Sequence, residues 1–491
     1  MRILGRVALG LLALALVLVG VVLVRTFTYK APAAADLTGV SVAPAIPVDV
    51  DRAARNLSAA IQIPTVRHQD RAEDDLAQWD RLHAFLQTTY PAAHAAMTRE
   101  VTDSQTLVYT WAGSDASLAP VILMAHQDVV PVTPGTEGAW KHPPFAGEIA
   151  EDAVWGRGAV DDKGSLIGLF EAVETLTAQG FKPKRTVIVV SGGDEEVMGS
   201  GAQAAARLLA ARGVKAEFVL DEGMAVITDN PLTGGRLAIV GTAEKGYATL
   251  KVTANATGGH SSAPPKDAGG VATLAKAITA IVDRPFPMAF RGPGADMVKT
   301  AAPLASFPVR MAVANEWLFG KLLIGQTAAT PAGAALLHTT IAPTMLKGSP
   351  KENVLPQDAT AWINYRIAPG DTSADVMARA KAATEGLPVT LSWNKTPAEP
   401  SPVSSTESAG WKAIAATAAA VSGAPVAPGL VTAGTDSRWL APVAKDVYRF
   451  QPVEFRLKEV EMIHGTNEHM TLKNLERMVQ FYGRLIVTAA Q

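Results

Sequence analysis

Five side chains that commonly bind metal ions occur in five separate short motifs along the chain. They are His126 in M-A-H-Q-D, Asp161 in G-R-G-A-V-D-D-K-G, Glu196 in G-G-D-E-E, Asp221 in V-L-D-E-G and His464 in I-H-G-T-N-E. Two imidazoles and three carboxylates form a ligand set suited to a pair of divalent ions such as zinc. A sixth acidic residue, Glu195, lies directly beside Glu196, where it could transfer protons instead of binding metal. These residue types predict a two-metal hydrolase.

Each of these motifs has a simpler explanation when it is considered alone. A histidine after a strand is usually packed in the core, an Asp–Asp pair between glycines usually forms a turn, and a Glu–Glu pair usually begins a helix. The spacing argues against coincidence, because 35 residues separate His126 from Asp161 and 35 separate Asp161 from Glu196. The first four candidate ligands also follow, or closely follow, apolar runs that resemble buried strands, and we expect the sites at His126, Asp161 and Glu196 each to end a strand of one sheet. Together the motifs indicate a single site.

The composition restricts the classes of protein to which the chain can belong. At 491 residues it is too long for one ordinary hydrophobic core, so we expect two domains. Lys and Arg number 44 against 46 Asp and Glu, and no basic block is present, so we expect no nucleic acid as a partner. Cysteine is absent, which excludes disulfides and cysteine-type zinc sites but leaves the compartment open.

The region around the first four candidate ligands alternates between strand-like and helix-like segments. The strand-like runs are Leu107–Trp111, Val121–Ala125, Thr186–Ser191 and Glu217–Leu220, and the helical stretches are Ser165–Ala178 and Ser200–Arg212. This alternation is typical of the α/β class, with a mainly parallel sheet flanked by helices. Ligands of such sheets gather at the carboxyl ends of the strands, and four site candidates fall just past a strand: His126, Glu195, Glu196 and Asp221.

The pattern changes after Gly241. Tyr247–Ala256 and Thr360–Ile367 alternate between apolar and polar residues, as strands do in an antiparallel sheet with one solvated face. We therefore expect residues 245–395 to form an inserted, smaller α+β lid or dimerisation domain with an antiparallel sheet.

The catalytic domain then consists of two parts, residues 51–244 and residues 396–491. The second part is required because the candidate ligand His464 must return to the other four. Residues 31–50 are rich in Ala and Pro without periodicity, which predicts a linker.

Residues 1–30 contain an apolar segment that could cross a membrane. Val7–Val24 is an uncharged stretch of 18 residues, which as a helix would span about 27 Å. A cleaved signal peptide and an uncleaved anchor are both compatible with it. The small-residue site at Ala33–Ala35 lies far beyond the apolar run, and the run exceeds the usual signal-peptide core, so we favour the anchor.

The charges that flank this segment give a weak orientation signal. Arg2 and Arg6 precede it, whereas Arg25 and Lys30 follow it. The positive-inside rule then places the catalytic body on the outer, extracytoplasmic face, or in the medium if the segment is cleaved.

The motifs together resemble a known enzyme family. M-A-H-Q-D-V-V-P-V, W-G-R-G-A-V-D-D-K-G, G-G-D-E-E-V-M-G-S, L-D-E-G and I-H-G-T-N-E are similar to motifs of the co-catalytic zinc metallopeptidases. That family includes aminoacylase, carnosinase-type dipeptidases, a desuccinylase and carboxypeptidase S. The likeness extends from about residue 50 to the end and looks closest to the carboxypeptidase S and N-fatty-acyl-amino-acid hydrolase branch.

The resemblance implies a role for each candidate ligand. Asp161 would bridge two Zn²⁺ ions, for which Co²⁺ or Mn²⁺ could substitute. His126 and Asp221 would complete one ion's site, and Glu196 and His464 the other. The Asp161–Asp162 peptide would be cis, as it is in the family.

Two further residues would support the reaction at these ions. Asp128 would fix the imidazole of His126 through its second ring nitrogen. Glu195 would be the general base that takes a proton from the attacking water and passes it to the leaving amine. From the sequence alone, Glu195 could instead be the ligand in place of Glu196.

The residues that would contact the substrate are implied by the resemblance as well. His260 in G-G-H-S-S-A-P-P would stabilise the oxyanion, supplied in dimeric members by the partner subunit. Asn353 and Arg366 would bind the substrate's backbone and free carboxylate, and arginine suits a carboxylate because its planar fork can pair with both oxygens. Gly434, Thr435 and Asp436 would form a nearby substrate loop, although Asp436 and Arg438 could also be an ordinary turn pair.

We therefore expect a membrane-tethered hydrolase that cleaves an amide bond next to a free carboxylate. Its substrate would be a peptide or an N-acyl amino acid, and homodimerisation through the inserted region is possible. A desuccinylase or deacetylase of biosynthetic intermediates is the alternative enzyme. A non-catalytic binding protein on the same scaffold is the alternative from another class, although it would be expected to have lost a ligand or the base.

Overall fold

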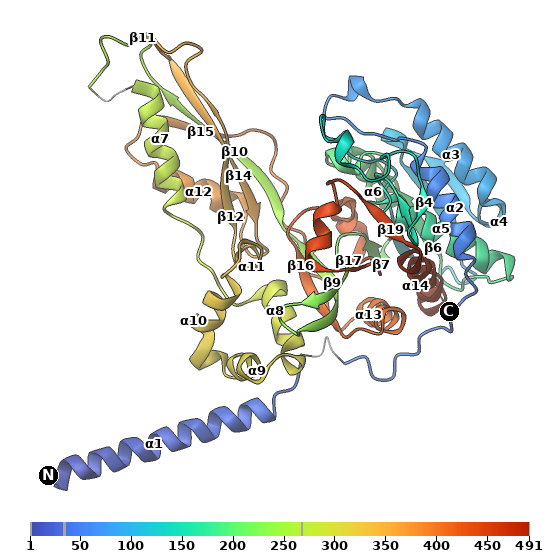
Figure 1. The fold of residues 1–491 in the computed structure, drawn as a ribbon, viewed down its shortest axis with the longest axis horizontal. Coiled ribbons are helices and arrows are strands. Elements are labelled where there is room, and N and C mark those ends of the chain that lie inside the picture. The colour runs from blue at the N-terminus through green and yellow to red at the C-terminus, as the bar shows by residue number, and fades with distance from the viewer. Residues whose placement is uncertain (1, 33–35, 267–268, 491) are drawn as a thin grey trace.

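A computed structural model describes residues 2–32, 36–266 and 269–490 of this protein. Figure 1 shows a wide body, a narrower unit that projects from it, and an N-terminal helix that extends away from both. The small-residue site at Ala33–Ala35 lies outside the described residues.

A sheet of ten strands forms the centre of the body, in the order β1-β2-β6-β3-β7-β17-β9-β8-β18, with β16 paired to β9. Its strands are β1 (Thr98–Val101), β2 (Leu107–Trp111), β3 (Val121–Met124), β6 (Val187–Ser191), β7 (Ala216–Asp221), β8 (Val226–Asn230), β9 (Gly235–Glu244), β16 (Val426–Val431), β17 (Ala444–Arg449) and β18 (Glu454–Phe455). The central strands β6, β3, β7 and β17 are parallel, as the sequence predicts.

The sheet as a whole is mixed. β2 runs antiparallel to β1 and β6, and β9 runs antiparallel to β17 and β8 but parallel to β16. For β2 the reason is the short connection that follows it: residues 112–120 contain no helix that could carry the chain across the sheet. A parallel return needs a crossover of about a dozen residues or more, so this link only turns the chain back.

Helices cover both faces of the large sheet. One face packs on α2 (Val50–Ile61), α3 (Ala77–Thr89), α4 (Pro91–Ala96), α5 (Lys163–Ala178), α13 (Ala409–Ser422) and α14 (Leu472–Ala490). The other face packs on α6 (Ser200–Ala211). Each face of the sheet has its own hydrophobic core. In β3, Leu123 belongs to the first core and Ile122 to the second, because successive side chains of a strand point to opposite sides.

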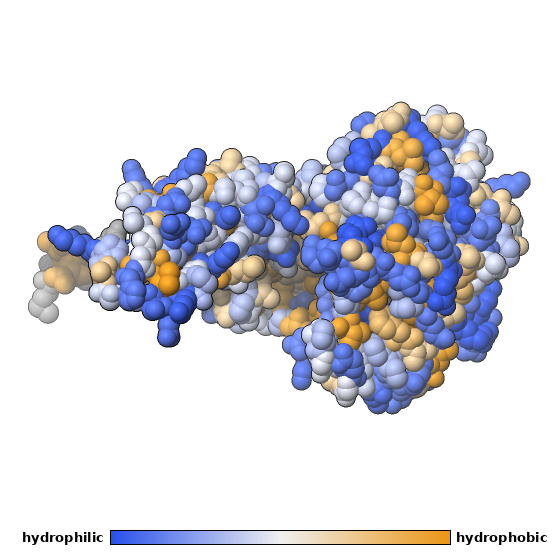
Figure 2. All heavy atoms as spheres, turned by 90° about the horizontal axis from the view of Figure 1, so that it is seen from above, coloured by the Kyte–Doolittle hydropathy of each residue, from blue (hydrophilic) through white to orange (hydrophobic). Residues whose placement is uncertain are grey.

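A second, antiparallel sheet forms the projecting unit, in the order β12-β14-β10-β15. Its strands are β10 (Gly246–Asn255), β12 (Thr340–Lys347), β14 (Asp358–Ile367) and β15 (Val389–Trp393). The helices α7 (Gly269–Val282) and α12 (Ser373–Ala383) bury one face of it, and residues of β10 alternate between buried and half-exposed. The predicted half-solvated antiparallel sheet is therefore present. Figure 2 shows this unit from above as the narrow part beside the wider body.

Four helices lie between α7 and β12 in the sequence, and the first of them packs on β16 and β9 of the body (Figure 1). They are α8 (Gly292–Ala301), α9 (Phe307–Ala314), α10 (Glu316–Thr327) and α11 (Pro331–Ala335). α8 joins the large core through Ala301, and the other residues of this group form a small core of their own with Leu337 and Phe290. Prolines at the first turns of α8, α9 and α11 divide this stretch into short helices.

The N-terminal helix α1 covers Arg2–Phe27. Its segment Ile3–Phe27 is long and apolar enough to cross a membrane. From residue 3 onward, Val22 and Thr26 are its buried residues, and both lie beside α9.

Candidate metal centre

His126 lies two residues after the end of β3 and is almost completely buried. Its Nδ1 lies 3.0 Å from the backbone oxygen of Asp128, and its Nε2 lies 2.8 Å from Oδ1 of Asp161. A proton on Nδ1 satisfies the carbonyl and leaves the lone pair of Nε2 for a metal.

Asp161 is placed by a loop and not by the large sheet. It follows β5 (Ala153–Trp155), which pairs with β4 (Ile149–Ala150) and β19 (His469–Thr471) in a separate three-stranded sheet. Our expectation that this site, too, ends a strand of the large sheet is therefore wrong. The Asp161–Asp162 peptide is cis, as the resemblance implies.

Glu468 provides the support that a strand end would otherwise give to Asp161. Its buried carboxylate accepts hydrogen bonds from the backbone N–H groups of Val160 (2.9 Å) and Asp161 (3.1 Å). It also pairs with Arg157 at 2.8 Å, and Arg157 donates to the carbonyl of His464 at 3.1 Å. One buried ion pair thus joins the Asp161 loop to the loop that carries His464.

Glu195 and Glu196 begin a single helical turn directly after β6. The buried carboxylate of Asp128 accepts both of their backbone N–H groups, each at 3.1 Å. Asp128 therefore fixes this turn relative to His126, a second connection that the sequence alone did not reveal.

His464 reaches the site from the C-terminal segment. Its Nε2 lies 3.0 Å from Oδ2 of Asp161 and 3.1 Å from Oε2 of Glu196. Because its ring is about half exposed, it forms the open side of the cluster.

Asp221 ends β7 and is held by backbone donors. Its Oδ1 accepts the N–H of Glu222 at 3.0 Å, and its Oδ2 accepts the N–H of Ser437 at 2.8 Å. It lies near enough to His126 for the two charges to interact.

The buried acids of this cluster strongly affect one another's ionisation. Burial raises the pKa of Glu196 to about 7, with Asp161 contributing, and burial also raises the pKa of Glu195 well above its usual value. Burial would raise the pKa of Asp161 as well, but hydrogen bonds from His126 and His464 outweigh it and lower that pKa. Several carboxylates thus share one site, and the positive charge that the protein supplies there is too small to neutralise them.

This donor set fits divalent metal ions. His126, Asp161 and Glu196 each offer a ligand atom, and these atoms lie within 4.8 Å of one another. Among the described residues Oε1 of Glu196 is buried without a hydrogen-bond partner, although such an oxygen ordinarily has one. A bound cation would satisfy that oxygen and offset the repulsion among the carboxylates.

The structure does not bring His260 and Asn353 to this cluster within one chain. Both lie at the tip of the antiparallel sheet, where β11 (Gly259–His260) pairs with β13 (Val354–Leu355) and Ser261 donates to the carbonyl of Asn353 at 3.2 Å. β10 runs from Gly246 at the body to Asn255 near this tip, so about 30 Å of strand separates the two ends.

Arg366 lies at the opposite end of the same sheet, beside the body. It pairs with Tyr247 across β10 and β14 and stacks on that ring at 4.8 Å. Burial lowers the pKa of Arg366, and the nearby Arg438 contributes to the decrease. Arg366 is therefore close to the segment that begins at Gly434.

The Gly434–Thr435–Asp436 segment is held firmly by buried contacts. The backbone N–H of Thr435 donates to Glu244 at 2.7 Å, and Glu244 also pairs with Arg449 at 3.0 Å. The carboxyl of Asp436 is buried against the backbone of Gly192 and Gly199, where a side chain on either glycine would collide with it. Asp436 therefore lies beneath the Glu195–Glu196 turn.

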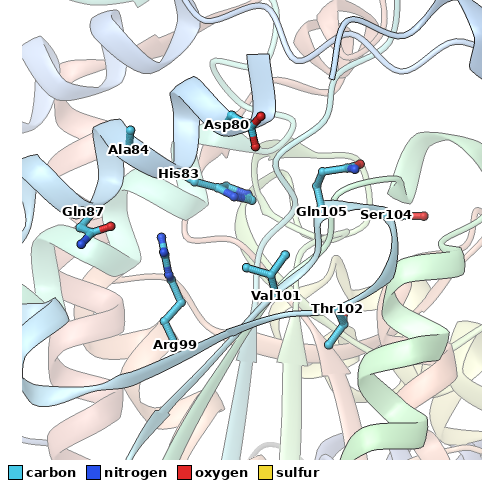
Figure 3. A pocket seen from close by; sticks show the side chains of 9 residues that line it. All are labelled: Asp80, His83, Ala84, Gln87, Arg99, Val101, Thr102, Ser104 and Gln105. Atoms are coloured by element: carbon cyan, nitrogen blue, oxygen red, sulfur yellow. The ribbon is translucent and has the colours of Figure 1, made fainter. Parts of the chain in front are cut away.

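A pocket of about 490 Å³ lies on another side of this region. Figure 3 shows His83 of α3 and Arg99 of β1 pointing into it. His83 Nε2 lies 2.8 Å from Oε1 of the buried Gln127, which donates to the carbonyl of Ser191 at 2.8 Å. The pocket therefore adjoins residues that support the candidate metal site, but none of the five predicted metal ligands lines it.

Residues 122–488 match the family described as Peptidase family M20/M25/M40. The chain belongs to this family. It is accordingly a metal-dependent hydrolase of amide or peptide bonds. The large and small sheets described above correspond to the fold of this family.

The sequence relatives cover most of the chain. An N-fatty-acyl-amino acid synthase/hydrolase of Xenopus tropicalis is 36% identical over 438 residues, 88% of this chain and 84% of the relative. A probable carboxypeptidase S-like protein of Dictyostelium discoideum is 33% identical over 440 residues, again 88% and 84%. Carboxypeptidase S of Saccharomyces cerevisiae is 31% identical, with 88% of this chain and 83% of the relative covered.

Solved structures share the fold at low sequence identity. The M20 family metallo-carboxypeptidase Sso-CP2 of Sulfolobus solfataricus has a TM-score of 0.61 at 17% identity, covering 89% of this chain and 99% of that one. Human carnosine dipeptidase 1 has a TM-score of 0.59 at 14% identity, covering 91% and 100%.

Proposed function

We propose that this protein hydrolyses an amide bond next to a free carboxylate, in a peptide or an N-acyl amino acid. The observation that carries the proposal is the meeting of His126, Asp161, Glu196 and His464 beside Glu195, with ligand atoms close enough to share cations. The relatives named as carboxypeptidase S and N-fatty-acyl-amino acid hydrolase support this substrate class over the desuccinylase alternative.

In this proposal two divalent ions occupy the centre, with zinc preferred and cobalt or manganese as substitutes. Asp161 would bridge them, His126 and Asp221 would hold one, and Glu196 and His464 the other. Such ions polarise a carbonyl oxygen and lower the pKa of water. The close contacts of Asp161 with both histidines support its assignment as the shared ligand.

The residues of the chain itself would then move the proton and orient the substrate. The carboxylate of Glu195 would accept a proton from the attacking water and deliver it to the leaving nitrogen. Arg366, at the end of the antiparallel sheet that adjoins the body, would pair with the substrate carboxylate. Thr435 and Asp436 would support this side of the site, and Gly434 packs against the guanidinium of Arg438.

Hydrolysis assays on the full-length protein test these roles. The substrates would be Gly-X dipeptides, N-acyl amino acids and their C-terminal amides, each assayed with added zinc, with chelator and with Glu195→Gln. We expect activity on free carboxylates to require metal and to fall about 10²–10⁴-fold in Glu195→Gln while bound metal is unchanged.

Glu217→Gln is the matched control, because Glu217 of β7 forms an ion pair with the exposed Lys445 of β17. Loss of metal in Glu195→Gln would make Glu195 a ligand in place of Glu196. Turnover of only succinylated or acetylated substrates would support the desuccinylase or deacetylase reading, and no turnover of any substrate by metal-loaded protein would support a binding protein.

We further propose that α1 is an uncleaved anchor that leaves the body on the extracytoplasmic face. Its last turns support this proposal, because the side chain of Asn315 donates to the carbonyl of Val22 at 3.2 Å and Arg25 donates to that of Ala314 at 3.1 Å. Cleavage would remove these contacts. The intact mass of the membrane-bound protein distinguishes an anchor from a cleaved signal peptide.

A homodimer through residues 245–395 is the remaining proposal about partners. It is motivated by the distance between the tip of the sheet and the metal cluster within one chain, which a second copy could close by supplying His260. Sedimentation of the detergent-solubilised protein measures the oligomeric state directly.

A further inference from the structure

α9 and α10 lie directly beside the point at which α1 leaves the body (Figure 1). Asn315, between the two helices, is completely buried and lies 3.2 Å from Oγ1 of Thr26. The hydroxyl of Tyr29 donates to the carbonyl of Lys299 at 2.9 Å, and Arg25 binds the carbonyl of Ala314. These contacts hold α1 against α9 and α10. A membrane that contains α1 therefore also sets the distance of these two helices from the bilayer.

Five large apolar side chains are exposed on α9, α10 and the turn before α9. They are Leu304 of the turn Ala302–Leu304, Phe307, Trp317, Leu318 and Leu322, with Trp317 at 59%. We call these five residues the α9–α10 apolar patch.

Part of the patch lies on one side of α10, and another part contacts α1. Trp317, Leu318 and Leu322 lie on the same half of the circumference of α10, and the exposed Lys321 lies among them. Phe307 contacts Phe27 of α1, with 5.7 Å between ring centres.

Positive charges border the patch where α1 ends. A pocket of about 680 Å³ is lined by Arg25, Lys30, Lys299 and Trp317. Glu316 is the acid among the lining residues, 3.0 Å from the Nζ of Lys299, and Asp296 also lies near Lys299. Tryptophan and basic side chains are the residues that concentrate at the membrane–water interface. The spare positive charge suits the phosphates of lipid headgroups.

We propose that the α9–α10 apolar patch rests in the headgroup region of the membrane that α1 spans. This inference rests on the proposed anchoring of α1 and goes beyond it. The body then contacts the bilayer directly, at a fixed distance and in a fixed orientation, and it does not move freely about the linker. A bilayer is favoured over a second copy as the occupant because the patch continues α1 and has a basic border.

Single cysteines can test this seating, because the natural chain contains no cysteine. Leu322→Cys reports on the patch, and Leu76→Cys, directly before α3, is its matched control, since the two leucines are 52% and 48% exposed. Leu14→Cys reports on α1 itself. Each full-length variant would carry a bimane label in nanodiscs of phosphatidylcholine and phosphatidylglycerol.

We expect lipids brominated deep in their acyl chains to quench the label at position 14, and lipids brominated on the acyl carbons next to the headgroup to quench the label at position 322. Aqueous iodide should quench the label at position 76. Iodide quenching at position 322 equal to that at position 76, with position 14 in lipid, would overturn the seating and leave the anchor intact. Iodide quenching at position 14 would overturn both. Shielding of position 322 from both quenchers, with two copies in each disc, would assign the patch to a second copy and would also overturn the proposal.

Discussion

The predicted metal ligands of the body and the predicted functional residues at the tip of the antiparallel sheet differ in how the fold holds them. In the body, ligands from four distant segments meet, and buried partners such as Asp128 and Glu468 hold them in place. At the tip, His260 is exposed and its ring accepts a hydrogen bond only from its neighbour Ser262 among the described contacts. The first region is organised by one chain, whereas the second needs another element to become a site.

The largest expected effect tests whether the tip takes part in catalysis at all. If His260 stabilises the oxyanion, His260→Ala should lower kcat about 10²–10³-fold, because it removes one preorganised donor. Bound metal should not change. Steady-state kinetics with metal analysis would check this, with Ser261→Ala as the control.

Mixing inactive variants would sharpen the same comparison. If a second copy supplies His260, then His260→Ala mixed with Glu195→Gln should regain part of the activity, because one site of the mixed dimer is intact. Normal activity in His260→Ala alone would show that the tip does not meet the metal cluster.

The next largest effect concerns Asp128, which holds the Glu195–Glu196 turn in place. Asp128→Asn should weaken metal binding or activity about 10–100-fold, because its carboxylate holds the backbone of Glu195 and Glu196 and faces Nδ1 of His126. Competition with a chromophoric chelator measures the affinity. Asp115→Asn is the control, since Asp115 caps an exposed turn. Equal affinities would show that the cluster organises without Asp128.

Arg366 tests the region where the two sheets meet. Arg366→Ala should raise KM for substrates with a free carboxylate about tenfold or more, since a hydrogen bond to a charged group contributes roughly 1.5–3 kcal/mol. Substrates with a C-terminal amide should be affected much less. Arg379→Ala, a surface arginine stacked on Phe286, is the control. An equal change in KM for acid and amide would remove Arg366 from carboxylate binding.

The smallest expected effect is a pH dependence of KM that arises from a lysine near Arg366. Burial lowers the pKa of Lys245 to about 8, with Arg366 contributing. Because lysine is charged below its pKa, the positive potential beside Arg366 should decrease as the pH rises through about 8. KM for carboxylate substrates should then increase a few-fold between pH 7 and pH 9, and this increase should be absent in Lys245→Met. A pH profile of KM that is identical in the variant would contradict this.

Much of the body was predictable from local patterns. The β2 strand begins and ends where its apolar run does, at Leu107 and Trp111, and α5 ends at the predicted Ala178. The cis peptide at Asp161–Asp162 also agrees with the family motif. The direction of β2 was not predictable from its own residues, because it depends on the connection that follows and on the neighbouring strand.

The sequence by itself determined which residues can bind metal and which segments form strands and helices, because ligand chemistry and side-chain periodicity are local properties. Only the tertiary structure decided that Glu468 holds the Asp161 loop, that Asp436 lies beneath the Glu195–Glu196 turn, and that His260 lies far from both. These are relations between segments that are distant along the chain. They arise from how the whole chain packs its buried charges and apolar surfaces, and no short motif contains that information.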